Sequence, residues 1–397
     1  MQHLIIKASE ILEDKFKIKP ERTKLYLHEN IKEFLNKTRN PEAQSIFFPG
    51  DLSAHVPRDR LDFILHEYHG HGLYCEQTPY GKKMIKDENN FNNMSQEEIQ
   101  KALILHEHLK PNFEGHALWT EDFLLTKLNK FEILENRLKE LETLTFQSQF
   151  HLELKTQKDV YNRVKQFELK KGIYELWYSL GFPRQFDKNT LIEIAKEKLS
   201  SRFDNLVLLI HFGSKNPERD IDLCAVLEDN VKLDEYEDSR TIDLVQYSNS
   251  DFLRRMKLFD LVVTHPLLTG ELISGDENLF ERLKIKLNKQ KPTNEAINYL
   301  KEKSRWCLDY AIECFNENDK YINALDLTLN NLCHALSYNE VSIIYSQRAS
   351  VISLDEMNNP LFREIRRYMK INESKKEKLS KTKEFIYGVK KEIYSLK

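Results

Sequence analysis

Acidic side chains that could hold a metal ion follow one another closely in the second half of this sequence of 397 residues. Asp220 and Asp222 stand two positions apart at the start of an apolar stretch, and Asp243 lies on a later one. Because side chains alternate across a β-strand, the first two carboxylates point to the same face. Neighbouring carboxylates repel each other unless a cation lies between them, and Mg²⁺ prefers oxygen ligands. The three aspartates therefore predict a magnesium site.

The elements that must position these carboxylates are short strands joined by a tight turn. Residues 206–212 form an apolar run that is typical of a buried strand, and the run ends at Gly213 and Ser214. A polar loop follows, in which Lys215 and Arg219 carry positive charge. The next two strands carry the aspartates. The sequence thus predicts a small sheet with a glycine-serine turn beside the carboxylates.

This order of features resembles the nucleotidyltransferase superfamily that includes DNA polymerase beta, and above all its minimal, antitoxin-like members. The resemblance covers about residues 200–285. Residues 265–275 look like the part of such domains where a helix ends and the chain leaves the sheet. The resemblance implies a small mixed-sheet nucleotidyltransferase domain.

The same resemblance implies roles for the side chains. Residues of the turn and its loop would bind the phosphates of ATP or another NTP: Gly213, Ser214, Lys215 and Arg219. Two Mg²⁺ ions held by the carboxylates would clamp an in-line attack on the α-phosphate. Asp220 and Asp222 would bind both ions, and Asp243 would help to activate the acceptor hydroxyl.

One feature departs from the family pattern. Only five residues separate Ser214 from Asp220, so the helix that relatives carry there would be about one turn long or missing. In the family the N-terminus of that helix helps to bind phosphate. A non-catalytic domain that keeps the fold is therefore an alternative to an active enzyme.

A second group of possible metal ligands lies nearer the N-terminus, in the sequence His-Glu-Tyr-His-Gly-His at positions 66–71. The zinc motif H-E-x-x-H places two histidines about 40° apart on one face of an α-helix. Here the second histidine comes one residue later, so His66 and His71 would be about 140° apart on a regular helix. A one-residue π-bulge at Gly70 would bring them together, and such bulges occur at functional sites.

The pattern His-Glu-x-x-Gly-His resembles metallopeptidases of the dipeptidyl-peptidase III kind, which have the inserted residue. Residues 113–121 resemble the second helix of gluzincins, where a Glu-Gly-x-Ala stretch supplies a ligand from its glutamate. The resemblance spans about residues 60–125. It implies a Zn²⁺ site formed by three ligands, His66, His71 and Glu114. Glu67 would be the general base that activates water.

Other side chains near this motif are second candidates for binding the metal or supporting a ligand: His69, His116 and Glu121. A histidine-rich surface helix without metal is the alternative interpretation. No substrate-binding strand can be identified from the sequence.

Composition limits the class of protein. The net charge of −3 at pH 7 gives no general attraction to nucleic acids or membranes. The five cysteines form no CxxC pair, which favours a reducing, cytoplasmic location. The first residues lack the long apolar core of a signal peptide, and no apolar run is long enough to span a bilayer.

Helical periodicity predicts mostly helical structure in the rest of the chain, over residues 1–45, from 121 to about 199, and over 295–397. The last stretch resembles the HEPN-type helical domain that often follows a minimal nucleotidyltransferase, without the Arg-x4–6-His motif of its RNase version. We therefore expect an α+β, mostly helical fold. Its domains would be an α-helical metallopeptidase-like domain (1–199), the nucleotidyltransferase domain (200–287) and a helical bundle (288–397).

These features predict a cytoplasmic fusion of two enzymes. One domain would transfer a nucleotide from an NTP to a protein hydroxyl or an RNA end, and the other would cleave a peptide. This pair of domains suggests a toxin–antitoxin or phage-defence setting, and the chain could form oligomers. Two alternatives stay open: a metallopeptidase whose nucleotidyltransferase domain only senses nucleotide, and a non-catalytic binding protein.

Overall fold

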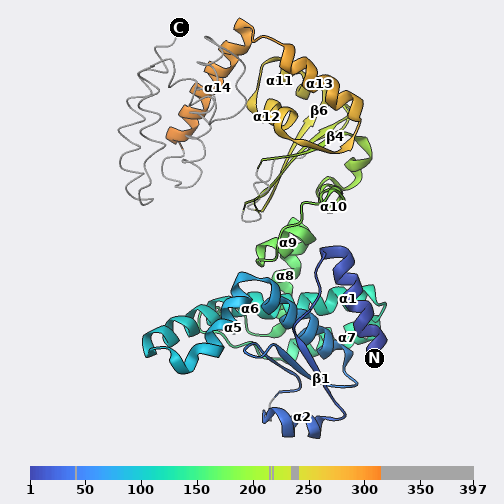
Figure 1. Ribbon diagram of the computed structural model, residues 1–397, viewed down its shortest axis with the longest axis vertical. Helices are drawn as coiled ribbons and strands as arrows, with labels where there is room; N and C mark the ends of the chain where they lie inside the picture. Colours follow the sequence, from blue (N-terminus) through green and yellow to red (C-terminus); the bar gives the residue numbers. More distant parts are fainter. Residues whose placement is uncertain (41–42, 214–215, 217–218, 234–240, 314–397) are drawn as a thin grey trace. The chain divides into compact units, whose positions relative to one another are not determined.

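The computed structural model describes residues 1–397 except for 41–42, 214–215, 217–218, 234–240 and 314–397. The chain divides into two compact units, Met1–Thr190 and Leu191–Lys397 (Figure 1). Both units combine helices with a small sheet. The predicted α+β, mostly helical class is confirmed.

The first unit contains a three-stranded sheet of order β1-β3-β2. β1 (Lys24–His28) is parallel to β3 (Ser53–Pro57), and β2 (Ile46–Phe48) is antiparallel to it. The helices of this unit are, in chain order, α1 (Gln2–Phe16), α2 (Ile31–Thr38), α3 (Leu61–Ile64), a π-helix (Leu65–Gly72), α4 (Leu73–Gln77), α5 (Pro79–Asn90), a short 3₁₀ turn (Phe91–Asn93), α6 (Gln96–Lys127), α7 (Phe131–Thr143), α8 (Gln157–Lys171) and α9 (Ile173–Ser179).

The prediction that residues 1–45 are helical is wrong in part, because β1 lies between α1 and α2. Leu25 and Leu27 of this strand pack with apolar side chains of β3, Ala54 and Val56. The pairing of β1 with a strand distant in the sequence decides its structure. Helical periodicity on either side could not reveal that partner.

An aromatic cluster holds α6, the long central helix of this unit. Trp119 on α6 is fully buried, and its ring lies 6.1 Å from that of Phe16 on α1. Phe16 also stacks on Trp177 of α9 at a ring distance of 4.0 Å. Burial of each large apolar side chain contributes about 2–3 kcal/mol to stability. The cluster therefore fixes α6, and with it the glutamates that α6 carries.

The second unit begins within α10 (Lys188–Leu199), which a 3₁₀ turn (Ser200–Asn205) joins to a four-stranded mixed sheet of order β6-β5-β4-β7. β4 (Leu206–Phe212) is antiparallel to β5 (Ile221–Leu227), and β6 (Ile242–Ser248) is parallel to it. The mixed sheet expected from the sequence is present.

The expectation that the chain leaves the sheet within residues 265–275 is wrong. Helix α12 (Leu261–Thr269) ends there as expected, but β7 (Glu271–Gly275) then pairs antiparallel with β4. Ile273 is buried, and β7 covers the edge of β4 that would otherwise present unpaired backbone groups. Such a short edge strand leaves no clear alternation in the sequence.

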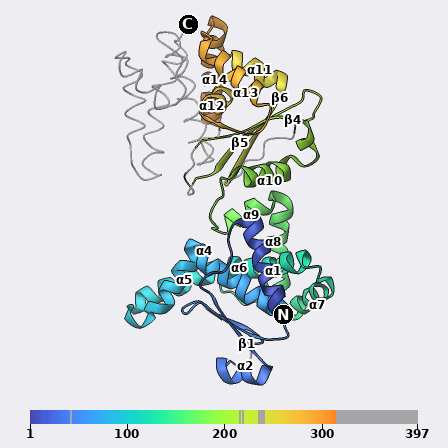
Figure 2. The same ribbon diagram turned by 45° about the vertical axis from the view of Figure 1, so that its right-hand side comes forward.

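Helices gather on one side of this sheet in both ribbon views (Figures 1 and 2). They are α11 (Asn249–Lys257), α12, α13 (Glu277–Lys289) and α14 (Asn294–Glu313). Their apolar side chains form one core with those of β4, β5 and β6. α14 belongs to the helical region predicted for residues 295–397, and the remainder of that region lies outside the described residues.

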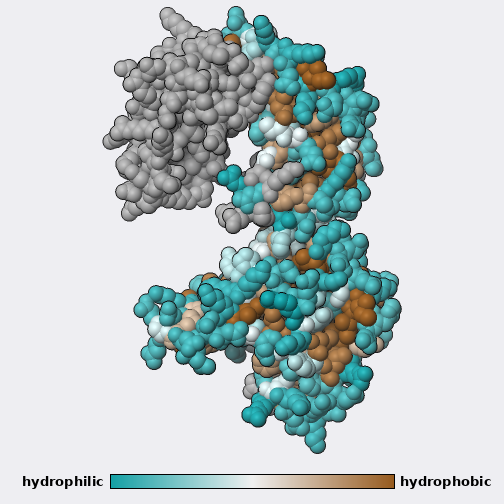
Figure 3. Space-filling view, in the orientation of Figure 1, coloured by the Kyte–Doolittle hydropathy of each residue, from teal (hydrophilic) through white to brown (hydrophobic). Residues whose placement is uncertain are grey.

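Among the residues that Figure 3 colours, hydrophilic ones occupy much of the surface, with hydrophobic patches between them. None of the helices that the structure describes is long and apolar enough to cross a membrane.

A buried aspartate ties three helices of the second unit together. Asp260, at the N-cap of α12, accepts hydrogen bonds from Tyr299 (2.8 Å) and Lys303 (2.6 Å) of α14. Arg255 of α11 donates a third, at 3.0 Å. Burial alone would raise the pKa of Asp260, but Lys303, Tyr299 and Arg255 hold this pKa below its ordinary value.

Replacing this carboxylate should destabilise the second unit. We expect Asp260→Asn to lower the free energy of unfolding by about 3 kcal/mol, because two cations lose a buried partner. The wild-type advantage should be full above about pH 5 and should shrink as the pH falls through the lowered pKa of the folded carboxyl group. Urea unfolding at several pH values, followed by hydrogen exchange in α12 peptides, measures both effects.

The control for this test is Asp204→Asn, because Asp204 is exposed and its change should alter stability by less than about 0.5 kcal/mol. Equal stability of Asp260→Asn and wild type at neutral pH would contradict the prediction.

Candidate functional site

The three aspartates predicted to bind metal come together at one end of the sheet in the second unit. Asp222 on β5 lies beside Asp243 on the parallel strand β6, and Asp220 immediately precedes β5. One ligand oxygen from each carboxylate lies within 4.8 Å of the others, and all three residues are partly exposed. Three carboxylates at this spacing suit a hard divalent cation.

The turn after β4 passes directly over Asp222. Gly213 has a φ of 79°, and a Cβ atom at this position would lie 2.0 Å from Asp222 Oδ2. Only glycine therefore allows the backbone to approach this carboxylate so closely. Ser214 and Lys215, which the sequence predicts to bind phosphate, lie outside the described residues.

The loop that follows Gly213 contains no helix among its described residues. The backbone N–H of Arg219, just before Asp220, donates to the carbonyl of Asn216 at 3.0 Å. Most of the segment in which the sequence predicts a short or missing helix lies outside the described residues.

The negative charges of the neighbouring carboxylates repel each other. Burial, and next the negative charge of Asp220, raise the pKa of Asp222 to about 6, while Arg219 opposes the shift. The ionised form of Asp222 is therefore disfavoured until positive charge arrives. A divalent cation between the carboxylates would relieve that repulsion.

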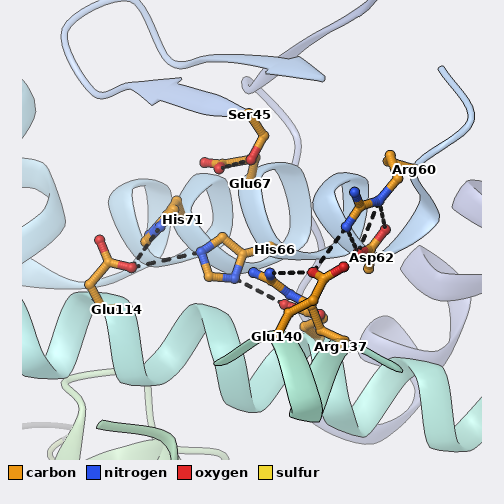
Figure 4. Close-up of polar contacts among 10 residues, drawn as sticks. Ser45, Arg60, Asp62, His66, Glu67, His71, Glu114, Arg137 and Glu140 are labelled. Atoms are coloured by element: carbon orange, nitrogen blue, oxygen red, sulfur yellow. Dashed lines mark hydrogen bonds and ion pairs between the residues drawn. The ribbon is translucent and has the colours of Figure 1, made fainter. Parts of the chain in front are cut away.

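The predicted zinc ligands come together in the first unit. Leu65–Gly72 forms a π-helix, whose i→i+5 spacing places His66 and His71 one turn apart. Their rings lie 4.7 Å apart between centroids. Figure 4 shows Glu114, from α6, beside both rings. Its Oε2 is 3.8 Å from His66 Nε2 and 3.7 Å from His71 Nε2.

This donor set fits a zinc ion. Two imidazole nitrogens and a carboxylate are a known catalytic set, and bond lengths of about 2.0–2.2 Å in a tetrahedron put neighbouring donors about 3.4 Å apart. Burial lowers the pKa of His66, but the neighbouring carboxylates of Glu114 and Glu121 outweigh it and raise the pKa to about 10. The carboxylates thus favour positive charge at this point.

A close crossing of helices explains the glycine inside the motif. A Cβ atom on Gly70 would lie 2.6 Å from Ala117 Cα and 2.8 Å from Ala117 Cβ. The π-helix can therefore approach α6 closely enough for its histidines to face Glu114. The one-residue bulge hypothesised at Gly70 corresponds to the π-helix that the structure shows.

Glu67 lies next to these ligands and is 6% exposed. Its Oε1 accepts a hydrogen bond of 2.6 Å from Ser45 Oγ (Figure 4). Burial raises the pKa of Glu67, against the effects of His66 and Ser45. A carboxylate with a raised pKa is a suitable general base near neutral pH.

The three predicted metal ligands and Glu67 line one cavity of about 350 Å³. Its walls include five apolar side chains: Ile46, Phe47, Phe63, Phe113 and Leu144. The first two belong to strand β2. β2 pairs with β3 on one side, and its other side carries no strand among the described residues. The cavity thus lies beside an edge strand.

The second-choice residues have different places. His69 is buried beside Ser9 at 3.0 Å, and His116 is buried beside Thr120 at 3.2 Å. Neither belongs to the group of possible metal ligands that the structure describes. Glu121 lies 3.1 Å from His66 Nδ1 and so supports a ligand from behind.

Sequence reasoning missed Ser45 and Arg137, which also line this cavity. Neither belongs to a motif. Ser45 precedes the three-residue strand β2, and Arg137 is one of many charged residues on an amphipathic helix. No signal in the sequence distinguishes them from their neighbours.

Comparisons with known proteins add little to this geometry. No protein-family model and no curated protein matches the chain. One similar solved structure is the crystal structure of a nucleotidyltransferase-like protein from Exiguobacterium sibiricum, with a TM-score of 0.28 and 12% sequence identity. The match covers 52% of this chain and 74% of that chain. Similarity at this level does not assign a function.

We expect each purified chain to bind one Zn²⁺ ion through His66, His71 and Glu114. His66→Ala removes one of three protein ligands, so the zinc retained after dialysis should fall about tenfold or more in metal analysis by mass spectrometry. His3→Ala, an exposed position on α1, should keep the full zinc content. A wild-type chain without zinc, or one matched by His66→Ala, would rule out this site.

Proposed function

We propose that the second unit transfers a nucleotide from ATP or another NTP to a hydroxyl acceptor. The observation that carries this proposal is the convergence of Asp220, Asp222 and Asp243 beside a glycine turn. The family resemblance supplies the reaction class. An acceptor on a protein Tyr, Ser or Thr, or at an RNA end, would fit a site whose carboxylates are partly exposed.

The chain's own residues would act in three ways. Asp220 and Asp222 would hold the divalent ions, and Asp243 would accept the proton of the acceptor hydroxyl. Gly213 lets the backbone of the turn approach Asp222 closely, and Arg219 would supply positive charge from the loop. When bound, Mg²⁺ neutralises charge on the transferred and leaving phosphates. The acceptor oxygen would attack the α-phosphorus in line, the bond from the α-phosphorus to the bridging oxygen would break, and pyrophosphate would leave.

Mg²⁺-dependent labelling by α-labelled NTP tests this proposal, with the chain itself, cellular proteins and total RNA as acceptors. Asp222→Asn removes a charge that positions the ions and should reduce labelling about 100-fold or more, equivalent to about 3 kcal/mol of barrier. Asp204→Asn is the matched control and should label normally. Labelling that is equal in wild type and Asp220→Asn/Asp222→Asn would rule out catalysis by this site.

We also propose that the first unit is a zinc metallopeptidase. The specific observation is that His66, His71 and Glu114 share one cavity with a buried carboxylate, Glu67. Zinc, when bound, would supply the Lewis acidity that polarises a peptide carbonyl. Glu67 would take a proton from the attacking water and pass it to the leaving amine.

The edge strand β2 provides a place for an extended peptide. Its backbone could pair with a substrate strand by β-augmentation, while Ile46 and Phe47 flank the cavity. Ser45, which precedes the strand, would hold Glu67 beside the substrate.

The two units together would form a fusion of two enzymes. The protein would be cytoplasmic and would act in toxin–antitoxin or defence systems. A metallopeptidase with a nucleotide-sensing second unit, and a binding protein without catalysis, are the rival functions. The first rival predicts zinc and cleavage without nucleotide transfer. The second predicts neither metal nor NTP binding.

Cleavage of a peptide pool tests the first unit, with products identified by mass spectrometry. Glu67→Gln keeps all three metal ligands but removes the base, so zinc content should stay normal while cleavage falls about 100-fold or more. Glu132→Gln, at an exposed position on α7, is the control. Full cleavage by Glu67→Gln would remove this residue from the mechanism, and a zinc-loaded wild type that cleaves nothing would reject the peptidase.

A further inference from the structure

A buried pair of charges lies behind the metal ligand His66. Glu121, on α6, is 2% exposed and uses its two oxygens for different partners. Oε2 is 3.1 Å from His66 Nδ1, and Oε1 accepts a hydrogen bond of 3.0 Å from Arg137 Nε. Arg137, on α7, is 7% exposed. The arginine therefore fixes one oxygen of Glu121 and leaves the other to face the histidine.

The ion pairs continue from Arg137 back to the helix that leads into the motif (Figure 4). Arg137 Nη1 is 3.2 Å from Glu140 Oε2, which is 3.3 Å from Arg60 Nη2. Arg60 Nη2 in turn donates to Asp62 Oδ2 at 2.6 Å. Asp62 lies on α3, which runs directly into the π-helix. The series of ion pairs thus begins at His66 on the π-helix and returns to Asp62 on α3, which directly precedes that helix.

The aromatic side chain of Phe63 packs against two arginines of these ion pairs and limits their movement. The Cζ atoms of Arg60 and Arg137 lie 3.7 Å and 5.0 Å from the centre of the Phe63 ring. A guanidinium group is attracted to the face of an aromatic ring. Arg137 is therefore held by two carboxylates and one ring, which leaves its guanidinium group little freedom.

A rigid Arg137 matters because a histidine that binds a metal needs a fixed tautomer and a fixed ring orientation. A metal-binding imidazole must present a lone pair on one nitrogen, and an acceptor at the other nitrogen fixes that tautomer and the ring orientation. Glu121 is the acceptor for His66 Nδ1, which leaves Nε2 toward Glu114 and His71. Without Arg137, the buried Glu121 carboxylate would lose its cation and could turn away.

We propose that Arg137 is a positioning residue for the metal ligand His66, which it orients through Glu121. Helix α7 is thereby part of the metal site, although it supplies no ligand. The inference rests on the proposed metal site and does not require that the site cleaves peptides.

The chain offers a matched control that shares helix α6 with the tested pair. Asp122, next to Glu121 on α6, is 6% exposed and accepts a hydrogen bond of 2.8 Å from Lys165 on α8. Tyr161 also donates to it, at 3.2 Å. Neither residue of this ion pair contacts His66, His71 or Glu114. Breaking it removes a comparable charge pair without touching a metal ligand.

The test measures the zinc dissociation constant of the full chain by competition with a chelator. We expect Arg137→Met to weaken zinc binding about 10–100-fold. Lys165→Met should stay within about threefold of wild type. Circular dichroism and thermal unfolding of the zinc-free chains would establish that both variants fold. Unchanged zinc binding by Arg137→Met, or equal loss in Lys165→Met, would overturn the proposal.

Two further variants separate positioning from general destabilisation. Arg137→Lys keeps the charge but not the planar fork, so its zinc binding should lie between wild type and Arg137→Met. The double variant Glu121→Gln/Arg137→Met should bind zinc less than about threefold more weakly than Glu121→Gln alone. Both substitutions act on the same contact, the one between Glu121 and His66. If the two substitutions weakened zinc binding independently, so that their effects multiplied, Arg137 would not act through Glu121.

The same measurement keeps this inference apart from the proposed function. Zinc binding that depends on Arg137 in a chain without peptidase activity would reject the peptidase and support the positioning role. A wild-type chain that binds no zinc would reject the metal site and the positioning role together.

Discussion

The crossing of the π-helix over α6 at Gly70 is the contact on which the first unit depends. Because no Cβ separates the two backbones, the π-helix approaches Ala117 closely enough for both histidines to face Glu114. The aromatic cluster around Trp119 holds α6 from behind. The geometry of the candidate zinc site therefore follows from a packing contact rather than from the ligands themselves.

The candidate site of the second unit follows a related rule. Gly213 lets the backbone pass over Asp222, and parallel pairing of β5 with β6 brings Asp243 alongside. In both sites, packing concentrates carboxylates that repel one another, at a cost in free energy that a divalent cation would offset. The raised pKa of Asp222 reflects burial and that repulsion, and the raised pKa of His66 shows that the carboxylates around it favour a positive charge.

The sequence predicted those features that depend on local spacing. Alternation along a strand placed Asp220 and Asp222 on one face, and the inserted residue before His71 indicated a π-bulge. The strands β1 and β7 escaped prediction because they are short and pair with partners distant in the chain.

Supporting residues are harder to predict than ligands. Ser45 and Arg137 contact the site only after folding brings β2 and α7 beside the π-helix. Their residue types are common and follow no motif. The roles proposed for Ser214 and Lys215 stay predictions, because both lie outside the described residues.

The π-helix also bears on how such a motif can change during evolution. Loss of the single codon for Gly70 would leave His-Glu-Tyr-His-His, in which the outer histidines have the H-E-x-x-H spacing of an ordinary α-helix. One deletion thus separates two zinc motifs that differ in length. The barrier between them is steric, since a side chain would then meet Ala117 where only glycine fits. Such a deletion would survive only together with a wider crossing of the two helices.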